Sequence, residues 1–248
     1  MNISDERFFA FFVSLWKEGE NMGNLSEELL SQLNPKISFT IPIFGGIPIG
    51  ESVVVTWIIM FALVVASILL TRNLKIVPNK RQACMETIVG GINNFFEDIL
   101  GEEGKVFIPY LGTIALYIAV ANLIGLVGLS PPTKELNITA GLAIMSVVVI
   151  YGSGLWTKGF KGWLKSFTEP MALVTPLNVL EILIRPLSLC MRLFGNVLGS
   201  FVIMELIKIV APLIIPIPLS MYFDIFDGLI QAFVFVFLTA LFIRESIE

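Results

Sequence analysis

Histidine is absent from the chain, which removes the residue most often used to bind metals and to transfer protons near neutral pH. Any proton or cation chemistry must therefore rely on carboxylates, lysine and arginine. Cysteine is almost absent as well. Cys84 and Cys190 lie far apart and form no CxxC pattern, so we interpret them as structural thiols rather than as a disulfide or a zinc site.

Charged residues are also scarce, at 15% of the chain against about 25% in a typical soluble domain. Hydrophobic residues make up 56% of the 248 residues, which is typical of an integral membrane protein. The net charge of −4 and the lack of a long basic run argue against a nucleic-acid partner. The sequence has no GxxxxGK[ST], HExxH or GxSxG motif, so we predict no enzyme activity of its own, no cofactor and no bound metal.

Apolar runs long enough to cross about 30 Å of hydrocarbon recur along residues 51–248. Five transmembrane spans are expected, at about 53–70, 107–129, 138–156, 175–210 and 219–243. Residues 80–100 form an amphipathic stripe that is too polar to span, and we expect a helix along the cytoplasmic interface. The predicted fold is an all-α membrane domain over residues 51–248, preceded by an acidic N-terminal segment over residues 1–50.

Two basic loops set the expected orientation. Their residues are Arg72, Lys75, Lys80 and Arg81 after the first span, and Lys158, Lys161 and Lys165 after the third. Both loops are cytoplasmic by the positive-inside rule, and they agree with each other. We therefore predict a multi-pass protein of the cell inner (plasma) membrane, with an extracytoplasmic N-terminus and a cytoplasmic C-terminus.

The fourth apolar run, from Thr175 to Val210, is too long for an upright membrane helix. About 36 residues at ~1.5 Å each give roughly 54 Å, well above the ~30 Å hydrocarbon core. Ordinary tilt averages only ~20°. We expect this helix and the last one to form a strongly tilted hairpin that follows a curved partner.

Charged residues nevertheless occur inside the apolar region from Met171 to Ile243. They are Glu181, Arg185, Arg192, Glu205, Lys208, Asp224 and Asp227. A charge at the membrane centre costs at least about 2.5–3.5 kcal/mol on insertion scales, so such residues face a protein interior or a wet cavity and mark ion pathways. For Arg192 the alternative is a snorkelling or structurally paired arginine.

A four-residue repeat places Ser188, Arg192, Asn196 and Ser200 on one side of the long helix. Gly195 and Gly199 between them favour close approach of another helix, although tight packing alone would also explain this pair.

On the last helix, Asp224, Asp227 and Gln231 follow a three-four spacing and are expected to form one narrow polar stripe. A solvated outer helix end is the alternative for the two aspartates. Gln231 lies deeper, where an unpaired amide would be costly, so we expect its partner on the helix of Arg192.

The order of these groups across the membrane predicts two separate paths. Glu181 lies on the inner side of Arg192, about 11 residues or ~16 Å along the helix. Glu205, Asp224 and Asp227 lie on the outer side. The arginine would form a positive barrier between the two paths.

Three stretches carry a resemblance to a known family. They read PLNVLEILIRPLSLCMRLFGN from Pro176 to Asn196, PPTKELN from Pro131 to Asn137, and IQAFVF from Ile230 to Phe235. In this order, from about Asn122 to the C-terminus, the chain resembles subunit a of rotary F-type ATP synthases. The Arg-Leu-Phe-Gly-Asn element in a membrane helix is specific, whereas the Pro-Pro-Thr turn alone is weak.

The resemblance implies the ion-conducting stator subunit of the membrane sector, with two half-channels that couple proton or sodium flow to ATP synthesis. It implies that Arg192 faces the essential carboxylate of a rotating ring of small hairpin (c) subunits and that Gln231 supports the arginine. Peripheral-stalk (b) subunits, the lipid bilayer and the transported H⁺ or Na⁺ are the other implied partners. The alternative is a self-contained secondary ion transporter or channel, which would normally show paired repeats or broken helices.

The chain also departs from the family pattern. It has Phe201 where many members carry Glu or His, Asp224 where some carry His, and Glu135 where Asp is common. The main carboxylate of the outer path therefore stays open between Asp224, Asp227 and Glu205, and so does the choice between H⁺ and Na⁺.

Overall fold

The computed structural model describes residues 37–41, 47–72, 74–166, 175–210 and 216–248. The chain divides into two compact units, Met1–Gly50 and Glu51–Glu248. In the first unit, strands β1 (Ile37–Ile41) and β2 (Ile47–Gly50) pair antiparallel, with an irregularity between Ile37 and Phe39. This short hairpin was not expected from the sequence. Extracytoplasmic placement of residues 1–50 stays a prediction.

The second unit is helical. Its long helices are α2 (Glu51–Thr71), α3 (Lys80–Leu100), α4 (Ile108–Leu123), α5 (Leu136–Ser166), α6 (Thr175–Val210) and α8 (Gly228–Ile247). Short elements join them: the 3₁₀ turns η1 (Lys105–Phe107), η2 (Ile124–Val127) and η3 (Pro132–Lys134), helix α7 (Pro216–Ser220) and the π-helix η5 (Met221–Asp227). Among the described residues, five helical stretches are long and apolar enough to cross a membrane, which confirms the predicted five spans beside α3.

Helix α8 is the core of the second unit. It packs against α3, α4 and α5, and its side chains Phe235, Val236, Ala240 and Ile243 are buried there. A helix that is apolar around most of its circumference is stable when neighbours cover it on several sides. Because α8 also carries Gln231, this packing fixes the position of that side chain.

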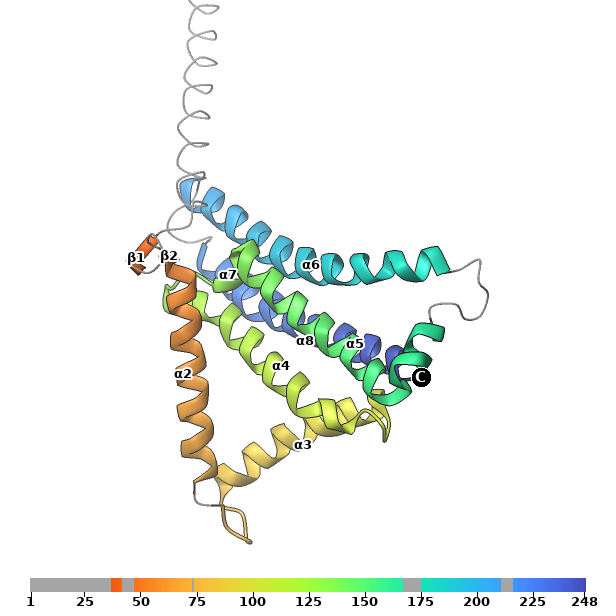
Figure 1. Ribbon diagram of the computed structural model, residues 1–248. Helices are drawn as coiled ribbons and strands as arrows, with labels where there is room; N and C mark the ends of the chain where they lie inside the picture. Colours follow the sequence, from red (N-terminus) through yellow and green to blue (C-terminus); the bar gives the residue numbers. More distant parts are fainter. Residues whose placement is uncertain (1–36, 42–46, 73, 167–174, 211–215) are drawn as a thin grey trace, which may run out of the picture. The chain divides into compact units, whose positions relative to one another are not determined.

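Helix α6 is one continuous element of 36 residues that passes through Pro186 without a break in its assignment. It packs along α5, and Figure 1 shows α6 and α8 running in opposite directions with α5 against both. In the same view α6 crosses the direction of α2 instead of following it. The length of the helix is as predicted; its tilt against the membrane normal stays a prediction.

Two helices differ from the expected boundaries. Helix α5 continues to Ser166 instead of ending near residue 156, with a break in its path at Gly159, where φ is 68° and ψ is 167°. The three lysines after residue 156 suggested a loop, but lysine is a good helix former. The helix changes direction at the glycine, which adopts the positive φ that other residues rarely adopt. The last span includes the π-helix η5. Hydrophobic periodicity does not reveal the i→i+5 hydrogen bonds of a π-helix.

Candidate ion-translocation site

Polar contacts join α6 to η5 and α8 at three levels. From one end of the pair to the other they are Ser200 with Asp227, Asn196 with Gln231, and Arg185 with Glu245. In this order the residue numbers fall along α6 and rise along the partner segment, as an antiparallel pair requires. Part of the four-residue repeat on α6 therefore faces α8.

The middle level is an amide pair. Nδ2 of Asn196 donates to Oε1 of Gln231 at 2.6 Å, which confirms that Gln231 finds its partner on the helix of Arg192. The Gln231 side chain is only 2% exposed, and its Nε2 has no hydrogen-bond partner within the described residues. A buried donor without an acceptor costs about 1–3 kcal/mol, so this Nε2 is a costly group to bury.

Arg192 lies at the edge of the open side of α6. Leu189 and Leu193 on the opposite side are buried, whereas Ser188 and Gly195 are exposed and Arg192 is half-buried. Across the described ranges, Arg192 forms no ion pair and no hydrogen bond. Its permanent charge is therefore not neutralised by any described group of this chain.

The two aspartates of η5 contact different neighbours. Oγ of Ser200 donates to Oδ2 of Asp227 at 3.3 Å, so Asp227 faces α6. Asp224 faces η2, because a Cβ added at Gly125 would lie 3.0 Å from Oδ1 of Asp224. Asp227 and Gln231 of the predicted narrow stripe therefore both contact α6, whereas Asp224 contacts η2, because the chain forms a π-helix where the prediction assumed α-helical spacing.

Asn122 anchors the start of α8 and was not singled out from the sequence. Its Nδ2 donates to the carbonyl oxygen of Gly228 at 2.9 Å, and its Oδ1 accepts from Oγ1 of Thr133 at 2.8 Å. Gly228 is needed here, since a Cβ on it would lie 2.9 Å from Cβ of Asn122. The available signal was an amide inside an apolar span, which is costly unless paired.

The η3 turn is tied to two other helices. Glu135, just after the turn, accepts a hydrogen bond from Oγ of Ser52 on α2 at 2.5 Å. Nζ of Lys134 lies 4.3 Å from the centroid of the Phe201 ring on α6. Many members of the family that the sequence resembles carry an acid or a histidine at position 201. In this chain the position holds an aromatic ring, and the ammonium group of Lys134 lies over it.

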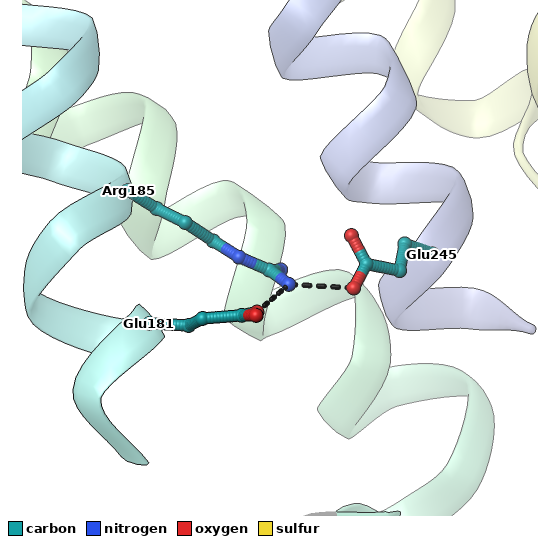
Figure 2. A network of polar contacts seen from close by, with 3 residues as sticks. All are labelled: Glu181, Arg185 and Glu245. Carbon is teal, nitrogen blue, oxygen red and sulfur yellow. Dashed lines mark hydrogen bonds and ion pairs between the residues drawn. The ribbon is translucent and has the colours of Figure 1, made fainter. Parts of the chain in front are cut away.

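At the other end of the pair, Arg185 forms a charged cluster (Figure 2). Its Nη2 lies 2.6 Å from Oε2 of Glu181, one turn earlier on α6, and 2.6 Å from Oε1 of Glu245 on α8. The guanidinium also lies 4.9 Å from the Phe242 ring centroid. Glu181, predicted as the carboxylate of the inner path, is thus paired within α6 with the arginine that also bonds to α8.

Two further observations complete the set of predicted residues. Glu205 belongs to α6, but its side chain lies outside what the structure describes. In the described part of the chain, no group of three or more cysteine, aspartate or glutamate side chains is placed to hold a metal ion.

The Arg185 cluster leads to a prediction about stability. We expect Arg185→Gln to lower the unfolding free energy by about 1–2 kcal/mol, since the side chain is only 13% exposed and bonds to both helices, while solvent screens its half-exposed partners. The melting temperature of the purified chain in detergent should fall by about 2–8 °C.

Arg244→Gln is the matched control, because within the described residues Arg244 pairs only with Glu248, one turn away at the exposed end of α8. Its effect should stay within about 0.5 kcal/mol. Equal shifts for the two variants would mean that the cluster does not hold α6 and α8 together.

Comparison with known proteins identifies the family. A family model described as "ATP synthase A chain" matches residues 53–244. The chain belongs to this family. The ATP synthase subunit a of Citrifermentans bemidjiense is 42% identical over 204 residues, which cover 80% of this chain and 88% of the relative. "ATP synthase subunit a 2" of Bradyrhizobium sp. BTAi1 is 37% identical over 217 residues, covering 87% and 97%.

A third relative, of Propionigenium modestum, is named "ATP synthase subunit a, sodium ion specific"; it is 34% identical over 218 residues, covering 82% of this chain and 75% of the relative. As a member of the subunit a family, the chain is the ion-conducting stator component of the membrane sector of an ATP synthase and a non-catalytic part of that complex. Its five candidate spans make it a multi-pass membrane protein.

Proposed function

We propose that the chain conducts ions through two half-channels that Arg192 separates, and that it does so against a ring of small hairpin (c) subunits. The observation that carries the proposal is the charged, half-buried Arg192 on the open side of α6, one turn from the Asn196–Gln231 pair. An arginine in this setting attracts a carboxylate that passes it, because planar guanidinium donors match carboxylate oxygens.

The proposed cycle starts on the outer side. An ion enters along Asp224 and Asp227, with Glu205 as a further candidate, and neutralises a ring carboxylate. A neutral carboxyl can then move through lipid at low cost, whereas a charged one is strongly penalised. After almost one turn of the ring, the site reaches the inner path near Glu181 and releases its ion.

Arg192 keeps the two paths apart. Its positive charge lowers the affinity of the facing carboxylate for a proton and repels cations that would otherwise leak directly across. Gln231, whose buried amide is bonded to α6 one turn from Arg192, supports the arginine at this position. Asn196 holds the Gln231 amide in place from α6, and Ser188 lies one turn before Arg192 on the same side.

The proposal includes placement in the cell inner membrane with the basic loops on the cytoplasmic side, and attachment to peripheral-stalk (b) subunits. The transported ion is H⁺ or Na⁺. One relative is sodium-specific by name, and that name describes the relative.

Cysteine crosslinking in the assembled complex tests the proposal. After replacement of Cys84 and Cys190, single cysteines at Met191 and Gly195, both exposed beside Arg192, should crosslink to a cysteine on the ring helix at several rotary positions. A cysteine at Leu116, which is 47% exposed on α4, is the control and should not crosslink. Crosslinks from Leu116 but not from Met191 or Gly195 would place the ring on another face and overturn the proposal.

A further inference from the structure

The end of α4 and the start of α8 fit together through two glycines, one on each segment. A Cβ on Gly228 would lie 2.9 Å from Cβ of Asn122, whose Nδ2 donates to the carbonyl oxygen of Gly228. Three residues after Asn122 the relation is reversed. A Cβ on Gly125 would lie 3.0 Å from Oδ1 and 3.4 Å from Oδ2 of Asp224. Each glycine thus leaves the space that a polar side chain of the other segment occupies. These two contacts, Asn122 with Gly228 and Asp224 with Gly125, are here named the reciprocal contacts.

The amide of the first contact is held from a third element. Oγ1 of Thr133, in η3, donates to Oδ1 of Asn122 at 2.8 Å, which directs Nδ2 of the same amide toward Gly228. Thr133 and Asn122 are 0% and 5% exposed. A buried amide that uses both its oxygen and its nitrogen has one favourable orientation, because any other leaves a polar atom unpaired. The bonds of Asn122 therefore fix the start of α8 relative to α4 and η3.

The reciprocal contacts lie where the last span leaves α-helical geometry. At the end of η5 the N–H of Gly228 bonds to the carbonyl oxygens of Ile225 and Phe223, and the second of these bonds spans five residues. A π-helical turn contains more residues than an α-helical turn, so side chains before it do not continue the faces of the helix that follows. The direction of Asp224 is therefore not set by α8 alone. Its contact with Gly125 is the described contact that places it.

We propose that Asn122 and Gly125 are positioning residues for ion entry. Asn122 fixes the start of α8, and Gly125 provides the space between η2 and η5 in which Asp224 holds its carboxylate. The inference rests on the proposed role of Asp224 in the outer path. It adds that the place of the carboxylate matters and that the segment carrying it does not. A carboxylate that reaches the same space from position 125 should therefore replace the carboxylate of Asp224.

Disulfide formation tests the position without relying on ion transport. The assembled complex is used after its subunit a chain has lost both native cysteines. Gly125→Cys with Asp224→Cys should form a disulfide on mild oxidation, because a Cβ at position 125 would lie only 3.3 Å from Cγ of Asp224. Gly125→Cys with Asp227→Cys is the control and should stay reduced, since Asp227 contacts α6. Adding Asn122→Ala should slow the first disulfide about threefold or more, because the start of α8 loses its bond to α4.

Relocation of the carboxylate tests the effect on transport. We expect Asp224→Ala to slow ATP-driven ion uptake into vesicles about tenfold or more. Gly125→Asp combined with Asp224→Ala should recover about a third or more of the original rate, because it returns a carboxylate to the same place. The φ of Gly125 is not positive, so the backbone accepts an aspartate there.

Two matched variants separate position from charge. Gly125→Asn with Asp224→Ala has the same shape without the carboxylate and should not recover transport. Leu126→Asp with Asp224→Ala puts a carboxylate on the next residue of η2, whose side chain is 46% exposed, and should not recover it either. Copurification of the other subunits checks that each complex has assembled.

Several results would overturn the inference. Recovery by Leu126→Asp as well as by Gly125→Asp would mean that any nearby carboxylate is sufficient. Failure of Gly125→Asp to recover transport in an assembled complex would mean that the segment carrying the carboxylate matters. Equal disulfide yields with Asp224→Cys and Asp227→Cys, or an unchanged rate with Asn122→Ala, would contradict the positioning. Normal uptake in Asp224→Ala would refute the outer path itself, and the inference with it, even where the disulfides form as expected.

Discussion

Replacing Arg192 with alanine is expected to abolish ATP-driven ion pumping and ion-driven ATP synthesis while the complex still assembles. The variant removes the fixed charge that separates the two proposed half-channels, and no other cation is described beside Asn196 and Gln231 to replace it. Loss of a single preorganised electrostatic group lowers rates by about 100-fold or more. Ion pumping is measured by the quenching of a pH-sensitive or sodium-sensitive dye in vesicles that contain the assembled complex.

Arg192→Lys is expected to fail as well, because a compact and strongly hydrated ammonium lacks the planar fork that can bind a carboxylate and an amide together. Arg244→Gln removes a charge from the same helix pair and should keep normal coupling, since Arg244 pairs with the terminal Glu248 and not with α6 in the described part of the chain. Normal coupled synthesis by an assembled Arg192→Ala complex would refute the central role of this residue.

The second large effect concerns the outer path. We expect Asp224→Asn to slow ion transport about tenfold or more, because asparagine keeps the size of the side chain but cannot accept and release a proton or bind a cation as a carboxylate does. Its contact with Gly125 should survive the change, so the structure around η2 is retained. Initial rates of ion uptake into vesicles, driven by ATP, provide the measurement.

Asp227→Asn and Glu205→Gln are the matched variants. Asp227 accepts a hydrogen bond from Ser200, which an amide oxygen can also accept, so its loss of charge should have the smaller effect. If Asp224→Asn is neutral and Glu205→Gln blocks transport, the outer path has been assigned to the wrong helix. A separate loss of transport in Glu181→Gln would locate the inner exit near the Arg185 cluster.

The membrane layout could be predicted because the bilayer imposes simple rules on the sequence. A span needs a long apolar run, and proline ends or interrupts it, so the bounds of α6 at Thr175 and Val210 were evident before the structure. The amphipathic stripe of α3 from Lys80 to Leu100 was equally clear. These features depend on each segment alone.

The site was less predictable because it depends on which segments meet. Sequence spacing put Gln231 opposite the helix of Arg192, but not opposite Asn196 in particular, and it gave no sign that Arg185 would reach Glu245. The π-helix η5 separates Asp224 from the line of Gln231, although both residues fit an α-helical stripe on paper. The bond from Asn122 to Gly228 joins residues 106 positions apart, which local patterns cannot indicate.

The three polar contacts that α6 makes with η5 and α8 also have a mechanical consequence. A stator must withstand the torque of the rotor that turns against it, and in the proposed complex that force reaches α6 near Arg192. The contacts at Arg185 and Ser200 lie on either side of this point, roughly 22 Å apart at ~1.5 Å per residue. Because α6 is held on both sides of the loaded point, a sideways force bends it less than it would bend a helix held on one side. Arg192 and Gln231 therefore keep their relative positions while the ring turns.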